Sequence, residues 1–247
     1  MRLNKYISET GACSRREADA WIAAGRVTIN GALAQLGTRV EEGDAVCVDG
    51  LPVGAARRHV YLALNKPVGI TCTTERHVRG NIVDFVGHRE RIFPIGRLDK
   101  DSEGLILLTN NGDIVNEILR SENEHEKEYR VEVDRPLTPA FLRAMAAGVP
   151  ILGTVTKPCR TERLGRNTFR IVLTQGLNRQ IRRMADATGL VVNKLKRVAF
   201  AGITIEGIRP GQWRELTDRE LSRLKRDYVN PARKHGRNAA REARDRD

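Results

Sequence analysis

A polar loop carrying two carboxylates lies between two apolar stretches of this chain. It reads Gly96-Arg-Leu-Asp-Lys-Asp-Ser-Glu-Gly104 and places Asp99 and Asp101 two residues apart. A carboxylate can act as a nucleophile or as a general base, and it must be ionised for either role. Charged loops are more often simply solvated. The loop by itself therefore leaves both catalysis and an exposed turn open.

The elements around this loop predict an α+β catalytic domain built on a mainly antiparallel sheet with flanking helices. We expect strands in four β-like runs, the last two with period-two alternation: 60–64, 105–109, 129–133 and 169–173. We expect helices at four further places: 113–119, 139–147, 179–188 and a last helix from Thr217, where Glu220 completes a capping box.

The first part of the chain predicts a small α/β unit of helices followed by short strands. Ser14 and Glu17 form a capping box at a helix start, and Asn30-Gly31 follows the strand run 27–29 as a tight-turn signal. A second run, 46–48, meets Asp49-Gly50 in the same way. The unit is nearly neutral, so a polyanion-binding face must come from local placement of its basic residues, notably Arg2, Lys5, Arg15, Arg16 and Arg26.

The whole chain is strongly basic. Its 247 residues carry a formal net charge of +12, and the sequence pI is about 10.1. Such a balance favours a polyanionic partner, because neutralising phosphates releases condensed counterions. A merely positive surface and an attraction to anionic lipid are the alternatives. No apolar run is long enough to cross a bilayer, so we expect no membrane partner.

The placement of the cysteines and histidines gives no sign of disulfide bonds or of a metal site. The four cysteines are scattered without a CxxC pair, which fits reduced thiols in a cytoplasm, and the start of the chain lacks the pattern of a signal peptide. The histidines have no metal-ligand spacing, and neither a GxGxxG nor a Walker loop is present. We therefore expect no metal and no cofactor.

Composition changes mark the domain boundaries. We expect a polyanion-binding unit at 1–56, a linker at 57–60, a catalytic domain at 61–224 and a disordered tail at 225–247. The tail holds eight Lys or Arg and four Asp or Glu residues with hardly any apolar side chain. It either attracts RNA non-specifically or is a solvated end without a role.

The order of residues in the polar loop resembles the catalytic signature of pseudouridine synthases, Gly-Arg-Leu-Asp followed by Ser/Thr-x-Gly-Leu. Three further motifs of that family have counterparts here: Asn65-Lys-Pro-Val-Gly69, Lys127-Glu-Tyr129 and the run 175–184. Residues 1–50 resemble the S4 RNA-binding domain. The resemblance covers nearly the whole chain and points to the RsuA/RluB/RluE/RluF branch. The sequences of segments 81–85 and Gln175-Gly-Leu-Asn-Arg-Gln180 are most similar to those of members that act on large-subunit rRNA.

This resemblance implies an enzyme that flips a uridine out of ribosomal RNA and isomerises it to pseudouridine. Asp99 would be the catalytic carboxylate, as nucleophile or as proton acceptor. Tyr129 would stack on the flipped base, worth roughly 1–3 kcal/mol, although an aromatic on an alternating strand is more often core. Arg182 would be the cation beside Asp99, or else a surface or phosphate-binding arginine.

Three more side chains are implied as substrate-binding residues, each with an alternative. Arg97 would hydrogen-bond RNA or fill the gap left by the flipped base, or it would brace the loop by pairing with Asp101 or Glu103. Leu195 would pack beneath the uracil or serve only the core. Lys66 would contact substrate, or it would belong to a constrained turn.

Two other functions remain open at this stage. One is a non-enzymatic S4-containing RNA binder, such as a ribosome-assembly protein. The other is a synthase acting on small-subunit rRNA. The favoured reading is a monomeric enzyme whose target uridine lies in large-subunit rRNA near the peptidyl-transferase centre.

Overall fold

The computed structural model describes residues 1–54, 58–119 and 125–229. Its chain divides into two compact units, each considered by itself below. The first contains 1–60 with 89–91 and 110–112, and the second contains 61–88, 92–109 and the chain from 113 onward. Within the described ranges, no helix is long and apolar enough to span a membrane.

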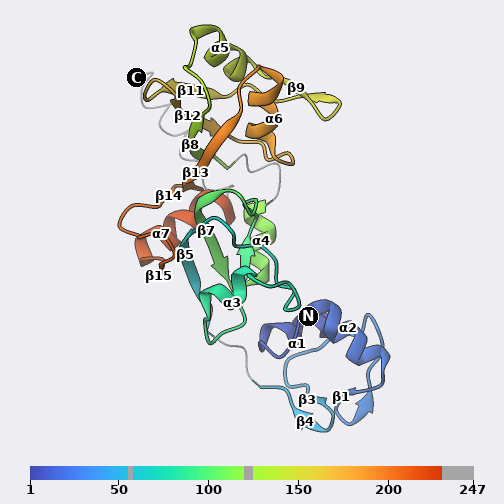
Figure 1. Ribbon diagram of the computed structural model, residues 1–247. Helices are drawn as coiled ribbons and strands as arrows, with labels where there is room; N and C mark the ends of the chain where they lie inside the picture. Colours follow the sequence, from blue (N-terminus) through green and yellow to red (C-terminus); the bar gives the residue numbers. More distant parts are fainter. Residues whose placement is uncertain (55–57, 120–124, 230–247) are drawn as a thin grey trace, which may run out of the picture. The chain divides into compact units, whose positions relative to one another are not determined.

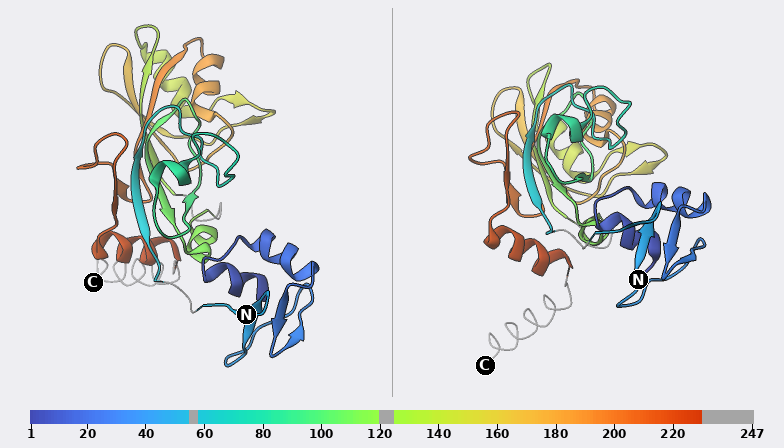
Figure 2. Two further views of the ribbon diagram at one scale, coloured as in Figure 1. Left: turned by 60° about the horizontal axis from the view of Figure 1, so that its bottom comes forward. Right: turned by 90° about the horizontal axis from the view of Figure 1, so that it is seen from below.

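The first unit packs two helices against a small antiparallel sheet. Helices α1 (Leu3–Glu9) and α2 (Arg15–Ala23) lie side by side on this sheet (Figures 1 and 2). The strands run in the order β2-β1-β3-β4, with bounds Ala32–Leu33, Val27–Ile29, Val46–Val48 and Leu51–Pro52. Leu3, Ile7 and Ile22 are almost fully buried between the layers.

Local signals in this unit act as the sequence predicts. Ser14 and Glu17 form the capping box at the start of α2, each side chain bonded to the other's backbone N–H. Asn30 and Gly31 both have positive φ, the conformation of a type I′ turn, and they join β1 to β2. The same conformation at Asp49-Gly50 joins β3 to β4.

The second unit is built on a nine-stranded sheet (Figure 1). Its main path is β11-β12-β8-β13-β7-β5-β15, with β14 paired to β13 and β6 paired to β7. The bounds in that order are Arg160–Arg163, Thr168–Leu173, Lys127–Val133, Val192–Phe200, Glu103–Thr109, Tyr61–Lys66, Trp213–Glu215, Ile203–Thr204 and Phe93–Ile95. Among the described strands, β13 and β7 form the one parallel pair. The predicted mainly antiparallel α+β fold is thus confirmed.

Helices cover both ends of this sheet. They are α3 (Ile82–Val86), α4 (Gly112–Leu119), α5 (Pro139–Ala147), α6 (Gln180–Ala187) and α7 (Asp218–Leu224). In Figure 1, α5 and α6 lie at the β11–β12 end, beside the short hairpin of β9 (Pro150–Ile151) and β10 (Thr154–Val155). α4 and α7 pack on β5 and β7, where Leu105, Leu107 and Ile118 are nearly inaccessible.

The C-terminal helix begins where the sequence predicts and continues further than expected. Thr217 and Glu220 form its capping box, and a π-helical turn, Lys225–Val229, follows α7. The expected disordered tail therefore begins with a helical turn. The remainder of that tail, 230–247, and residue 57 of the expected linker lie outside the described residues.

Candidate active site

The polar loop connects β6 to β7 and is held by backbone bonds instead of lying free in solvent. The Ser102 amide donates to the Asp99 carbonyl at 3.1 Å, and the Gly69 amide donates to the Lys100 carbonyl at 2.8 Å. Leu98 is buried, and its amide donates to the Cys72 sulfur at 3.4 Å. These bonds fix the direction in which the residues between Leu98 and Ser102 point.

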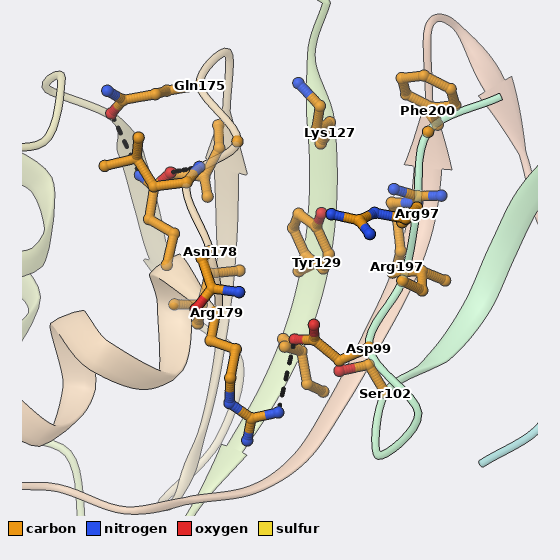
Figure 3. Close-up of a pocket in the computed structure, with 18 of the residues that line it drawn as sticks. Arg97, Asp99, Ser102, Lys127, Tyr129, Gln175, Asn178, Arg179, Arg197 and Phe200 are labelled. Carbon is orange, nitrogen blue, oxygen red and sulfur yellow. Dashed lines mark hydrogen bonds and ion pairs between the residues drawn. The ribbon is translucent and has the colours of Figure 1, made fainter. Parts of the chain in front are cut away.

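Asp99 lines a cleft of about 790 Å3 in the second unit. Its side chain is 34% exposed, so the carboxylate is open to a ligand. The cleft floor is formed by alternate residues of two neighbouring strands: Lys127 and Tyr129 from β8, and Leu195 and Arg197 from β13. Figure 3 shows Asp99 and Tyr129 facing the same space. Strand alternation thus gathers an aromatic, an aliphatic and two basic side chains opposite the carboxylate.

The cation beside Asp99 is Arg179, whose Nη1 lies 3.8 Å from the Asp99 Oδ2 (Figure 3). Arg179 also donates two hydrogen bonds to the Asp101 carboxylate, at 3.0 and 2.8 Å. It sits at the N-cap of α6 with φ +50°, a left-handed conformation that costs a non-glycine residue energy. The backbone at this position therefore directs the guanidinium toward the loop.

Arg182 does not make the predicted contact with Asp99. Its guanidinium instead bridges two carbonyls, those of Asp101 and Val192, at 2.9 Å each, and its Nε lies 3.4 Å from the Asp101 carboxylate. Arg179 stands at the left-handed N-cap of α6 whereas Arg182 lies within the helix, and their guanidinium groups therefore meet the loop at different points. The hydrogen bond from Arg179 and the nearby guanidinium charges hold the pKa of Asp101 below its usual range.

The three predicted substrate-binding residues have different surroundings. Leu195 is buried in the cleft floor, 7% exposed. Arg97 also lines the cleft, is exposed, and makes no ion pair with Asp101, Glu103 or any other residue that the structure describes. The alternative in which Arg97 braces the loop is therefore absent from this structure.

Lys66 is fully buried and is not part of the cleft lining, and its contact with substrate stays a prediction. Its ammonium donates to the carbonyls of Pro67 and Ile70, at 3.0 and 2.9 Å. These bonds hold the turn after β5, and burial lowers the pKa of Lys66. Such bonds are what the constrained-turn alternative expects.

The part of the cleft that lies beyond Tyr129 is basic, and we call it the basic end: Lys127, Arg197 and His125. Arg197 is 2% exposed, and its Nε donates to the Leu105 carbonyl at 2.7 Å. Burial, reinforced by the charge of Arg197, lowers the pKa of Lys127 to about 8. Burial and Lys127 together lower the pKa of His125 to about 4, so this imidazole is neutral at pH 7.

The five basic residues predicted to bind RNA in the first unit lie on or beside its helices. Arg2 and Arg16 are exposed, whereas Lys5 is half-buried and 3.5 Å from Glu9. Arg15 is half-buried in the first turn of α2. Arg26 is exposed and donates to both carboxylate oxygens of Asp49. Their contact with RNA stays a prediction.

Sequence reasoning missed three residues that line the cleft: Arg179, Lys127 and Arg197. Arg179 stands in the same run as Arg182, and the choice between them needed the conformation of the helix start. Lys127 could have been predicted to line the cleft, because it is two residues from Tyr129 and therefore on the same face of the strand. Arg197 required β13 to be recognised as a strand.

Comparison with known families agrees with this arrangement. The family model described as RNA pseudouridylate synthase matches residues 60–187, and the S4 domain model matches residues 1–53. The chain belongs to the RNA pseudouridylate synthase family, as its motifs predicted.

Individual relatives extend the similarity over almost the whole chain. The dual-specificity RNA pseudouridine synthase RluF of Escherichia coli K12 is 58% identical over 223 residues, 90% of this chain and 77% of that protein. The ribosomal large subunit pseudouridine synthase B of Bacillus subtilis is 37% identical, covering 96% of this chain and 99% of that protein. A crystal structure described as a pseudouridylate synthase superimposes with a TM-score of 0.67 at 28% identity, over 91% of this chain and 99% of its own.

Proposed function

We propose that this enzyme isomerises a specific uridine in large-subunit ribosomal RNA, near the peptidyl-transferase centre, to pseudouridine. The observation that carries the proposal is the meeting of Asp99, Tyr129 and Leu195 in one cleft, with Arg179 beside the carboxylate. The names of the relatives support RNA as the substrate, and that of the Bacillus subtilis protein specifies the large ribosomal subunit.

The chemistry needs a carboxylate and no redox partner. The bond between ribose and uracil N1 breaks, the base turns within the cleft, and a new bond forms to C5, which loses its hydrogen. Asp99 attacks the sugar or removes a ribose proton, and Arg179, 3.8 Å away, orients this carboxylate. Tyr129 and Leu195 hold the detached uracil between an aromatic and an aliphatic surface, so that it rotates without escaping.

The RNA must present its uridine outside a helix, because a stacked base cannot reach Asp99. Flipping costs a few kcal/mol, and stacking on Tyr129 returns roughly 1–3 kcal/mol. Arg97 is exposed at the cleft and can enter the gap that the base leaves. Arg2, Lys5, Arg15, Arg16 and Arg26 of the S4 domain bind phosphates further along the RNA and set which uridine is chosen.

Tritium release tests this proposal. Ribosomal RNA labelled at uracil C5 is incubated with wild-type protein, with Asp99→Asn and with Asp218→Asn, a control at an exposed position in the first turn of α7. Formation of the bond to C5 must expel the label, so release reports the reaction and not mere binding. We expect release from wild type and the control, and none from Asp99→Asn, whose RNA affinity stays nearly normal.

Other outcomes select among the alternatives. Comparable turnover by Asp99→Asn would remove Asp99 from the mechanism. Release from small-subunit RNA alone would transfer the target to that subunit. No release from free RNA or from assembled subunits, with RNA still bound, would identify a non-enzymatic S4-type RNA binder.

A further inference from the structure

Two cations at the basic end, the buried Arg197 and the half-buried Lys127, lack a counter-ion among the described residues. Lys127 and Arg197 make no ion pair with any carboxylate in the described parts of the chain. On the paired strands β8 and β13, Arg197 is the direct neighbour of Tyr129, and Lys127 lies two residues from Tyr129 on the same face. Their positive charges therefore lie next to each other and next to the expected base-stacking residue.

Internal hydrogen bonds satisfy these cations only in part. The Lys127 ammonium donates to the carbonyls of His125 and Thr174, both at the long distance of 3.3 Å. Arg197 donates its Nε to Leu105, and its guanidinium carbon lies 4.9 Å from the centre of the Phe200 ring. One Nη of Arg197 is fully buried and has no hydrogen-bond partner.

Keeping two unpaired charges in this position is unfavourable for the protein alone. A charge held away from water without a partner is destabilising, and the same loss of hydration lowers the pKa of Lys127. The backbone around Arg197 is nevertheless closely packed against β7. Only glycine fits at position Gly104, because a Cβ there would lie 2.7 Å from the Arg197 amide nitrogen. A structural role accounts for the bonds already made, but not for the donors left over.

We propose that the basic end binds one backbone phosphate of the RNA strand, next to the nucleotide whose base stacks on Tyr129. This inference rests on the proposed function, since it assigns a subsite of the same cleft. A phosphodiester supplies what the site lacks: a full negative charge shared by Lys127 and Arg197, and oxygens that accept from a guanidinium nitrogen. A uracil carbonyl would accept one hydrogen bond but would leave both charges uncompensated.

The placement also suits a nucleotide in the cleft. A base and its adjoining phosphate are separated by one ribose, and the reaction takes place at that ribose. An anchor on the phosphate side, together with Tyr129 on the base side, holds the sugar carbon between two fixed points beside Asp99. Such positioning lowers the entropic cost of reaching the reactive geometry.

A binding experiment with neutralised phosphates tests the site. The probe is a short single-stranded RNA of cytidines with one central uridine, in which each phosphate in turn is replaced by an uncharged methylphosphonate. Affinity for the full-length protein is measured for wild type, Lys127→Gln, Lys127→Arg and Lys194→Gln. Lys194 is the matched control, because it lies on β13 but is 72% exposed and outside the cleft lining.

We expect one methylphosphonate next to the uridine to weaken wild-type binding about tenfold, a typical loss for a charged contact. Lys127→Gln should weaken binding of unmodified RNA by a similar factor, and the two changes together should cost no more than either alone. The slope of log affinity against log salt should fall by about 0.7 in Lys127→Gln. Lys127→Arg should restore it, and Lys194→Gln should leave the coupling intact.

Other results would overturn the proposal. Additive effects would mean that Lys127 and that phosphate act independently, and a flat methylphosphonate scan would mean that the basic end binds no phosphate. If Lys127→Gln does not fold, a flat scan on wild type still overturns the proposal. Tritium release, measured separately, distinguishes the failure of the proposed reaction from the failure of the phosphate site. If Lys127 and the phosphate are coupled but no tritium is released, only the proposed reaction is contradicted. If tritium is released but Lys127 and the phosphate are not coupled, only the phosphate site is contradicted.

Discussion

The two ends of the cleft differ in whether their cations are paired with carboxylates. At what we call the acidic end, Asp99 and Asp101 face Arg179 and Arg182, and carboxylates and guanidinium groups balance one another. At the basic end, the positive charges of Lys127 and Arg197 lie together with no carboxylate paired to either among the described residues. Tyr129 lies on the floor of the same cleft, as the cross-strand neighbour of Arg197. The acidic end is complete as built, whereas the basic end is completed by a ligand.

This difference separates residues that organise the catalyst from residues that bind its substrate. Pairing at the acidic end sets the loop geometry before RNA arrives, which is what a preorganised carboxylate requires. The unpaired cations at the basic end remain available to bind the substrate, but they lower the stability of the protein when no substrate is bound. Functional sites often lower stability in this way. Three predictions test this contrast.

The largest effect is expected from Gly104→Ala, because it affects both ends together. Gly104 has φ +107°, and an added Cβ would collide with the Arg197 backbone, 2.7 Å from its nitrogen and 2.9 Å from its carbonyl carbon. β7 and β13 must separate there, which moves the loop that precedes β7 and the cation on β13. We expect a loss of about 3–5 kcal/mol in unfolding free energy, measured by urea denaturation, with loss of tritium release.

Gly207→Ala is the matched control. Gly207 also has positive φ, +74°, but nothing lies within 4 Å of the added Cβ. This substitution should lower the unfolding free energy only by the cost of placing alanine at positive φ, about 1–2 kcal/mol, and leave the cleft unchanged. Equal losses in the two variants would show that conformation, and not the close approach of β13, is what Gly104 supplies.

The parts of the fold that were predictable from sequence are those with local causes. The caps at Ser14 and Thr217 and the Asn30-Gly31 turn act over three or four residues, so the helix starts and hairpin follow from the chain itself. The roles expected of Asp99 and Tyr129 came from motif order, and both residues line one cleft.

What sequence reasoning missed depends on tertiary contacts. β13 carries Lys194, Lys196 and Arg197, and two register irregularities interrupt its pairing with β8, so buried and exposed residues do not alternate regularly along it. Its strand conformation is imposed by β8 and β7 on its two sides. The exchange of Arg179 for Arg182 as the partner of Asp99 likewise follows from a left-handed N-cap that composition does not reveal.

The second prediction uses pH to sharpen the contrast. Lys127 loses its proton at pH about 8 in the folded protein and at 10.5 when unperturbed. Between these values the unfolded chain binds more protons, so stability should rise with pH, whereas paired carboxylates add stability only as pH rises from acid. The gain is at most about 3 kcal/mol. Nearby His125, with its pKa of about 4, does not titrate in this window.

The measurement is urea unfolding of wild type and Lys127→Gln between pH 8 and 10.5. Other titrating groups contribute equally to both proteins and cancel in the difference. We expect wild type to gain stability relative to the variant over this window. A constant difference would mean that Lys127 is charged and already compensated, which would make the two ends alike.

The third prediction separates the two arginines of the acidic end. Arg179 is 41% exposed and is the residue beside Asp99, so Arg179→Gln should lower kcat about 100-fold with little change in unfolding temperature. Arg182 is 14% exposed and bridges two carbonyls, so Arg182→Gln should cost about 2 kcal/mol of stability with a smaller direct effect on kcat. Tritium-release kinetics and thermal unfolding of both variants provide the two readouts.

The opposite pattern would contradict the structural assignment. If Arg182→Gln lost turnover at unchanged stability while Arg179→Gln remained active, Arg182 would reach Asp99 once RNA is bound, and the loop would have to move to allow it. That motion would need the Arg182 bonds to the Asp101 and Val192 carbonyls to break. Arg182→Lys then distinguishes the cases, because lysine keeps the charge that Asp99 needs but cannot span both carbonyls at once.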